Sequence, residues 1–380
     1  MLLAVVTATL LASASSSASA ADANASQYAV HWPTLLPEPG KNKGGGATYL
    51  NSMPLGNGHV AANVLFDSGS GKLVALIASS SAWAESGELM KVALLEVNLY
   101  DLDRSKPIAQ TLDPQTATFT LSSDGKAVAT VYIDANSDTL VVTKAAAAAA
   151  TLAALRVDAA SGVGAVTPSF SCQPYTVSKD VAGSAGPNGP LFVYHRNANC
   201  SGPNDYMATT LADENIPSPS GFIDPLKLRA TGAAVATSSD GGTTVVAVLT
   251  DDSGSSTATG FEAVLAEAAA NAMVGASGAA MKQAHEAWWA AKWAGHYIHV
   301  STQDSGGGNA SDGARLSKMY ALERYTQIIQ ARIPKSGVTY TPIKVRTPAA
   351  PAADAAAAAA TAPSAPAPSA PADLLSPPHS

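Results

Sequence analysis

The sequence predicts a mainly β protein built around a large antiparallel β-sandwich. Between about residues 28 and 258, short segments of alternating apolar and polar residues recur, separated by turns rich in glycine and aspartate. After residue 258 the alternation stops, and apolar residues recur at helical spacing. Many short strands joined by such turns are typical of a sandwich, so we expect a β-sandwich domain over residues 28–258 with helices after it.

The first 21 residues resemble a secretory signal peptide. A short apolar core runs from Leu2 to Leu11, and Ala-Ser-Ala precedes Ala21, which suits cleavage by signal peptidase. We therefore expect residues 1–21 to be removed and the protein to be secreted. An alanine-rich leader that stays on the chain is the alternative. The apolar run is shorter than the roughly 20 residues that a membrane-spanning helix needs, and we expect no membrane association.

Two hairpins and two single strands are the clearest elements of the predicted sandwich. "ATFTLSSDGKAVATVYID" predicts a hairpin that turns at residues 123–126, and "KLRATGAAVATSSDGGTTVVAVLTDD" predicts a second that turns at residues 240–242. "DTLVVTK" is a further strand. "KVALLEVNLYD" alternates, which places four apolar residues on one face: Ala93, Leu95, Val97 and Leu99.

Two helical segments follow, and then a tail. "GFEAVLAEAAANAM" and "MKQAHEAWWAAKWAGH" predict a helical linker over residues 259–300, and "SDGARLSKMYALERYTQIIQARIP" predicts a further helix. His285, Trp289 and Trp293 share one stripe of the second linker helix, which indicates a helix buried between two apolar surfaces. Residues 347–380 are rich in proline, alanine and serine, and this composition predicts a disordered tail.

Composition excludes several classes of partner. The chain has 380 residues, a formal net charge of −7 and only 13% charged residues, so it has no basic surface suited to nucleic acid. It has neither a P-loop nor a dinucleotide fingerprint, and we predict no cofactor. Cys172 and Cys200 are the two cysteines. In an oxidising compartment they can form a disulfide, and two buried free thiols are the alternative.

No local motif identifies a catalytic or metal site. Asp and Glu residues are scattered, although glycoside hydrolysis needs two paired carboxyl groups. His296 and His299 lack neighbouring ligands, so no metal is predicted. Trp83 lies in a polar turn, where an exposed aromatic ring can stack on a sugar or simply pack on the edge of the sandwich. His195 and Asn197 lie at a strand end, where they either contact a ligand or form a hydrogen-bonded corner.

The order of several motifs resembles a known family. Pro54-Leu55-Gly56-Asn57-Gly58 precedes a strand and then Ser81-Ala82-Trp83 with Glu85; "QTLDPQTATFTL", "YHRN", "IDPLKLRATGAAV", "HEAWWAAKW" and "SKMYALERYTQIIQARIPKSG" follow. This order, over about residues 28–340, resembles a domain of unknown function at the N-terminus of six-hairpin glycosidase-like proteins. That domain is related to the N-terminal sandwich of glycoside hydrolase family ninety-five, the alpha-L-fucosidases.

The resemblance implies that a catalytic (α/α)6 barrel follows the sandwich and its linker. Residues 301–346 then correspond to the start of that barrel, and the sequence departs from the family because it continues into the tail. The acid and base of the relatives lie in the barrel, so no catalytic residue is assigned here, and it stays open whether this chain is an enzyme. We expect a truncated protein in which the tryptophan stripe of the linker helix, Trp288, Trp289 and Trp293, is exposed.

The resemblance also gives the Pro54–Gly58 turn a role, on the surface that faces the barrel. Five residues are then predicted to line a substrate or interdomain surface: Asn57, His59, Trp83, His195 and Asn197. The predicted function is that of the N-terminal sandwich portion of a secreted fucosidase-like protein. A stand-alone carbohydrate-binding or cell-wall module is the alternative. Neither the sugar nor the oligomeric state follows from the sequence.

Overall fold

The computed structural model describes part of the chain: residues 24–32, 52–85, 87–99, 102–144, 150–153, 178, 180–186, 189–198, 206–217, 224–251, 257–294, 298, 300 and 310–330. All of them belong to one compact unit, Met1–Lys344. The predicted signal peptide, the predicted tail and both cysteines lie outside the described residues, so these predictions stay predictions.

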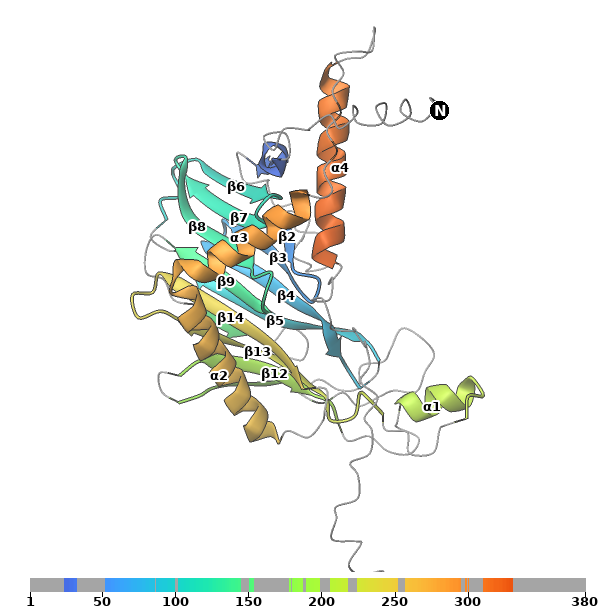
Figure 1. The fold of residues 1–380 in the computed structure, drawn as a ribbon. Helices are drawn as coiled ribbons and strands as arrows, with labels where there is room; N and C mark the ends of the chain where they lie inside the picture. Colours follow the sequence, from blue (N-terminus) through green and yellow to red (C-terminus); the bar gives the residue numbers. More distant parts are fainter. Residues whose placement is uncertain are drawn as a thin grey trace, which may run out of the picture. The chain divides into compact units, whose positions relative to one another are not determined.

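Two antiparallel sheets form the body of this unit (Figure 1). The larger sheet has nine strands in the order β1 (Val30–Trp32), β6 (Ile108–Asp113), β7 (Thr118–Ser123), β8 (Lys126–Ile133), β9 (Thr139–Lys144), β14 (Thr243–Asp251), β13 (Ala230–Thr237), β12 (Leu191–Arg196) and β11 (Val181–Ser184). The smaller sheet has five strands in the order β10 (Ala150–Ala153), β5 (Leu89–Asn98), β4 (Lys72–Trp83), β3 (Val60–Asp67) and β2 (Met53–Gly56). The predicted mainly β fold with antiparallel sheets is confirmed.

The core between the two sheets follows from the alternation in the sequence. In β5, Ala93, Leu95 and Val97 are all buried, as their shared face predicts. They meet residues of the larger sheet such as Phe119 and Val246 in one continuous apolar cluster. Fully burying a side chain of this size contributes roughly 1.5–3 kcal/mol, so this cluster is the main source of stability.

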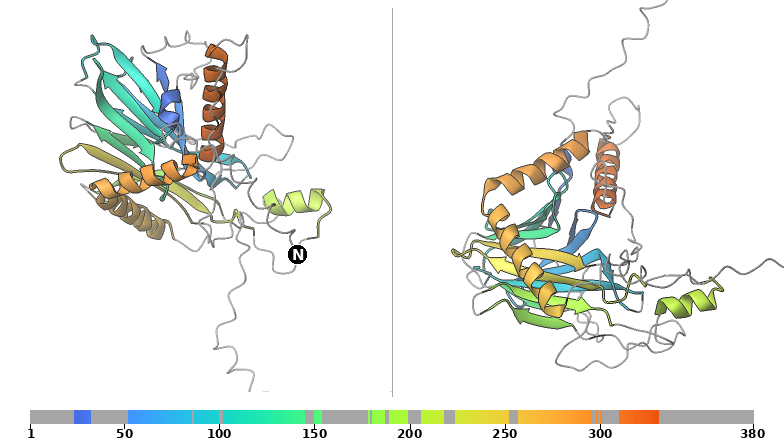
Figure 2. Two further views of the ribbon diagram at one scale, coloured as in Figure 1. Left: turned by 45° about the horizontal axis from the view of Figure 1, so that its top comes forward. Right: turned by 60° about the horizontal axis from the view of Figure 1, so that its bottom comes forward.

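Both faces of the larger sheet are covered, which explains why its central strands are almost uniformly apolar. Val246 and Val248 of β14 face the smaller sheet, whereas Val245 and Ala247 belong to a second apolar cluster on the opposite face. Helix α2 (Ala258–Ala276) covers that opposite face, across β12, β13 and β14 (Figure 2).

Four α-helices accompany the sheets in the part of the chain that the structure describes: α1 (Tyr206–Asp213), α2, α3 (Ala279–Ala294) and α4 (Ala310–Gln330). The strand-and-turn pattern of residues 28–258 did not predict α1. Thr257 caps α2 by accepting a hydrogen bond from the Gly260 backbone N–H. No single described helix is long and apolar enough to cross a membrane; α2 and α3 together meet that length and composition, but they bend by 84°.

The expectation of an exposed tryptophan stripe was wrong. Trp289 and Trp293 of α3 are both 0% exposed, and Trp288 is partly buried against the same core. The Trp293 indole N–H donates to the Pro114 carbonyl at 2.9 Å, and the Trp289 ring lies 5.6 Å from that of Tyr325 in α4. The loop before β7 and helix α4 therefore provide the apolar surfaces that cover the stripe.

Candidate functional site

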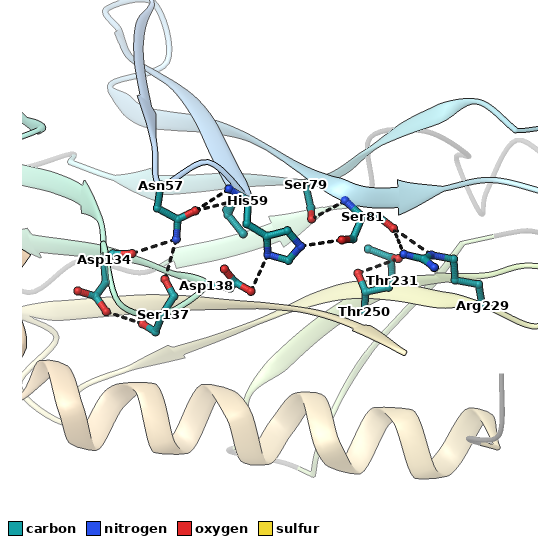
Figure 3. A network of polar contacts seen from close by, with 11 residues as sticks. Asn57, His59, Ser79, Ser81, Asp134, Ser137, Asp138, Arg229, Thr231 and Thr250 are labelled. Atoms are coloured by element: carbon teal, nitrogen blue, oxygen red, sulfur yellow. Dashed lines mark hydrogen bonds and ion pairs between the residues drawn. The ribbon is translucent and has the colours of Figure 1, made fainter. Parts of the chain in front are cut away.

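The predicted motif at Pro54–Gly58 forms the end of β2 and the start of the turn to β3, and Asn57 is the structural centre of that turn (Figure 3). The Asn57 side-chain oxygen accepts hydrogen bonds from the backbone N–H groups of His59 and Val60, at 3.0 and 2.9 Å. Its amide group donates to the carbonyls of Asp134 and Ser137 in the β8–β9 turn, at 3.0 and 2.9 Å. Asn57 thus joins the edge of the smaller sheet to a turn of the larger one.

The same segment also contacts helix α4. The Gly58 backbone N–H donates to the Ile329 carbonyl at 3.0 Å, and the Tyr325 hydroxyl donates to the Pro54 carbonyl at 2.7 Å. A Cβ atom at Gly56 would lie 2.8 Å from the Ile329 carbonyl oxygen, and Gly58 has a φ of 84°. Glycine is required at both positions, at Gly56 for close approach and at Gly58 for a left-handed backbone.

His59 connects a hydroxyl to a carboxylate. Its Nε2 lies 2.7 Å from Ser81 Oγ, and its Nδ1 lies 2.7 Å from Asp138 Oδ2. The His59 and Asp138 side chains are 13% and 23% exposed. This Ser–His–Asp line runs from β4 through the β2–β3 turn to the β8–β9 turn (Figure 3). No sequence motif indicates it, because its members are far apart in the chain.

Ser81 lies where β4 departs from regular pairing with β5. Ala78 pairs with Lys91, but the next pair is Trp83 with Leu89, so β4 uses more residues than β5 between the two pairs. The Arg229 guanidinium donates from Nε and Nη2 to the Ser81 carbonyl, at 3.0 and 2.8 Å. Irregular strands of this kind re-aim side chains and are common beside functional sites.

A second cluster surrounds His195 on β12. Its Nδ1 lies 2.8 Å from Asp180 Oδ1, and its Nε2 lies 3.1 Å from Glu85 Oε2. All three side chains are 7% exposed or less. Ionised carboxylates only accept hydrogen bonds, so both ring nitrogens must donate, and His195 is an imidazolium between two carboxylates.

Glu85 is further held by backbone groups. Its Oε1 accepts from the N–H groups of Ser178 and Ala198, at 2.9 and 3.0 Å. Burial alone would raise the pKa of Glu85, but the hydrogen bond and the charge of His195, together with backbone donors, lower it to about 2. This carboxylate therefore stays ionised at any physiological pH.

Asn197 and Trp83 meet at the rim of this cluster. The Asn197 amide donates to the carbonyls of Trp83 and Leu226, at 3.0 and 2.8 Å, and the residue is 2% exposed. Trp83 is 40% exposed, and its indole N–H donates to the Ser80 carbonyl at 2.9 Å. Of the five predicted residues, only Trp83 presents a large surface to solvent.

The structure thus divides the five predicted residues between two clusters. Asn57 and His59 lie at the β2–β3 turn, where His59 meets Ser81 of β4, whereas Trp83, His195 and Asn197 lie around the last residue of β4 and the segment that follows it. Sequence reasoning did not name Ser81, Asp138, Asp180 or Arg229 as site residues. In the sequence each of them is only a polar residue in or beside an apolar strand. Such a residue does not reveal which distant residue it contacts.

The cavity at the His195 cluster is small. A cavity of about 10 Å³ beside His195, also lined by Lys91, Asp180 and Thr231, is about the size of one water molecule. Among the described residues, no group of three or more His, Cys, Asp or Glu side chains is arranged to hold a metal ion. At His195 the reason is direct, since both ring nitrogens already face carboxylate oxygens.

The fold and these internal clusters define a two-sheet β-sandwich domain whose buried polar residues join its sheets and turns. The chain belongs to the family of the domain of unknown function DUF5703, whose N-terminal domain model matches residues 43–264. No curated protein matches the sequence.

Among solved structures, one match is described as "Putative kojibiose phosphorylase from human microbiome", with 9% sequence identity and a TM-score of 0.35. The alignment covers 80% of this chain and 39% of that one, so this chain spans well under half of that protein's length.

Proposed function

We propose that this chain is the N-terminal sandwich portion of a secreted, fucosidase-like glycoside hydrolase, and that the sandwich supports a helical domain without cleaving glycosidic bonds itself. In this proposal α4 is the first helix of the helical domain, and the surface with Asn57 and His59 lies at the junction. The family match and the order of the motifs support the assignment to this group.

The contact of α4 with the Pro54–Gly58 motif is the observation on which the proposal rests. This turn opens the motif series that resembles the glycosidase-like group, and α4 contacts it through both the Tyr325 hydroxyl and the Ile329 carbonyl. Gly56 and Gly58 fit this contact and would not tolerate larger residues. A turn shaped for one helix is what a sandwich needs if its task is to position a helical partner.

The buried carboxylates support a non-catalytic sandwich. Two carboxyl groups that cleave a glycosidic bond lie on either side of it, about 5–9.5 Å apart depending on mechanism. Glu85 and Asp180 instead enclose the His195 ring and bond directly to it. The adjoining cavity of about 10 Å³ has no room for a sugar.

The experiment incubates the purified full chain with aryl α-L-fucosides and with plant and algal polysaccharides, and measures released aryl alcohol and reducing sugar. We expect no turnover above buffer. Turnover that persists through purification and disappears in Asp180→Asn, with the variant still folded by circular dichroism, would refute the proposal.

A second candidate, a stand-alone carbohydrate-binding module, is favoured by Trp83. Its exposed ring and its cross-strand neighbour Leu89, 57% exposed, form an apolar surface that suits the face of a sugar. Glycan-array binding that is lost in Trp83→Ala, but kept in Ile216→Ala, would favour this function. Ile216 is a matched control because it is also exposed, at 52%, and lies on another part of the chain. Absence of binding to any glycan would count against it.

A further inference from the structure

We propose that Ser81, His59 and Asp138 form a nucleophile–base–carboxylate site that hydrolyses small acyl esters. The roles follow from which ring nitrogen faces which partner. Asp138 accepts from Nδ1–H at 2.7 Å, which leaves the Nε2 lone pair directed at Ser81 Oγ, also at 2.7 Å. This is the arrangement in which imidazole removes a proton from a serine hydroxyl, and it is recognised by geometry on unrelated folds.

The surrounding backbone fixes all three members. Asn57 accepts from the His59 N–H, and the Ser80 N–H donates to the His59 carbonyl at 2.9 Å. Arg229 holds the Ser81 carbonyl with two hydrogen bonds, and the Val248 N–H donates to the Asp138 carbonyl at 2.9 Å. A hydroxyl, a ring and a carboxylate held by separate elements are pre-organised, which catalysis requires.

Exposure sets the class of substrate. The His59 and Asp138 side chains are 13% and 23% exposed, and Ser81 is half-buried. Solvent therefore reaches the site, and a half-buried Ser81 favours a small acyl group over a bulky one. The substrate is an ester of a short acyl group, such as an acetate ester, whose alcohol part remains outside. That this alcohol is a carbohydrate rests on the proposed function.

The reaction balances with water as the co-reactant. Ser81 Oγ attacks the ester carbonyl carbon while its proton passes to His59 Nε2. The carbon–oxygen bond to the alcohol breaks, and the alcohol leaves with that proton. Water then loses a proton to His59 Nε2 and attacks the acyl carbon. The bond between that carbon and Ser81 Oγ breaks, and Oγ takes the proton back from Nε2, which releases the carboxylic acid and restores Ser81. Asp138 is a positioning residue that keeps the ring in the required tautomer.

Covalent labelling tests the nucleophile. The full chain is treated with a fluorophosphonate probe, and the adduct is located by peptide mass spectrometry. We expect one adduct, on Ser81, and none in Ser81→Ala. Ser80→Ala is the matched control, because Ser80 is the adjacent serine and its side chain is exposed, and we expect full labelling there.

The base and the positioning residue have their own readouts. We expect His59→Gln to slow labelling about 100-fold or more, as loss of a general base does. Asp138→Asn should slow it as well, and Asp138→Glu should restore part of the rate, which a purely structural role would not produce. No Ser81 adduct on folded wild-type protein, or equal labelling rates in wild type and His59→Gln, would overturn the proposal.

Turnover separates this site from the proposed function. The chain is assayed for acetate release from p-nitrophenyl acetate and from acetylated polysaccharide. Turnover of both, lost in Ser81→Ala, supports the site and its carbohydrate substrate. Turnover of p-nitrophenyl acetate alone supports the site and removes the link to carbohydrate. Turnover of either that survives in Ser81→Ala assigns the activity elsewhere and overturns the proposal.

Discussion

His195 and His285 are both almost completely buried, at 5% and 0% exposure, yet opposite chemistry surrounds them. His195 lies between the carboxylates of Glu85 and Asp180 and carries a charge. His285 on α3 lies between two backbone groups: its Nδ1 accepts from the Ala135 N–H at 3.1 Å, and its Nε2 donates to the Thr116 carbonyl at 2.8 Å. That pattern requires a neutral ring. Burial disfavours the charged ring at both sites, and only at His195 do directly bonded carboxylates offset it.

The two histidines also join different layers. His195 connects β12 to residues beside β11 and β4, and so links the two sheets of the sandwich. His285 connects α3 to the turns that flank β7 and β9, and Tyr132 and Trp289 pack on its ring. An internal ion cluster therefore stabilises one end of the sandwich, and neutral hydrogen bonds attach the helical layer.

The largest expected effect comes from breaking the charged cluster. Glu85→Gln leaves the His195 imidazolium with one carboxylate in a buried site. Removing one partner of a buried ion pair costs about 3–5 kcal/mol of folding free energy. Chemical denaturation measures the loss. Glu88→Gln is the control, because Glu88 is exposed in the same turn and its change should cost about 0.5 kcal/mol or less.

The dependence of folding stability on acid pH tests the charged cluster at His195 further. The folded-state pKa of Glu85, about 2, lies below its ordinary value of 4.5. The unfolded chain therefore takes up this proton first, and stability is lost as pH falls from about 4.5 towards 2, by roughly 3 kcal/mol at most. We expect the difference in unfolding free energy between wild type and Glu85→Gln to shrink across this range. A difference that stays constant with pH would contradict the ion cluster.

The contribution of His285 to folding stability changes in a higher pH range than that of Glu85. Burial lowers its pKa below the ordinary value of 6.5 and outweighs the hydrogen bond to the Thr116 carbonyl and the nearby Asp134 and Glu286, which raise it. The unfolded chain again takes up the proton first, so this stability is complete above pH 6.5 and is lost as pH falls through the folded pKa.

His285→Leu should cost about 2–3 kcal/mol at neutral pH, because it leaves the Ala135 N–H and the Thr116 carbonyl without their partner. Urea unfolding followed by tryptophan fluorescence measures it. We expect the cost to fall below pH 6.5, where the wild-type ring is penalised for charging. A cost that grows as pH falls would show that the ring is charged in the folded protein.

The sequence predicted the sandwich better than it predicted these clusters. Strand alternation has a period of two and turns are local, so the buried face of β5 and the β7–β8 hairpin follow from neighbouring residues alone. The partner of a polar residue depends instead on sheet pairing. His59 and Asp138 are 79 positions apart, and His195 and Glu85 are 110 apart.

The tryptophan stripe also shows that sequence spacing does not identify the distant residues that a side chain contacts. Its helical spacing predicted a buried face, which the structure confirms for Trp289 and Trp293. The expectation that the face would be exposed assumed that its partner surface was missing. The Pro114–Thr116 loop and α4 supply that surface, and neither could be assigned to it from sequence spacing.

The smallest expected effect is the loss of one neutral hydrogen bond, which measures the contribution of such a bond to the free energy of unfolding. Tyr325→Phe removes the hydroxyl that donates to the Pro54 carbonyl at 2.7 Å and leaves the ring packed against Trp289. The loss should be about 1 kcal/mol in unfolding free energy, independent of pH between 5 and 8. Met319→Ala on the same helix is the control, because its side chain is 59% exposed. Faster hydrogen exchange in the last turn of α4 for Tyr325→Phe alone would place the lost energy at the docking contact. If Tyr325→Phe costs as much as His285→Leu, the neutral attachment of the helical layer depends on α4 as much as on α3.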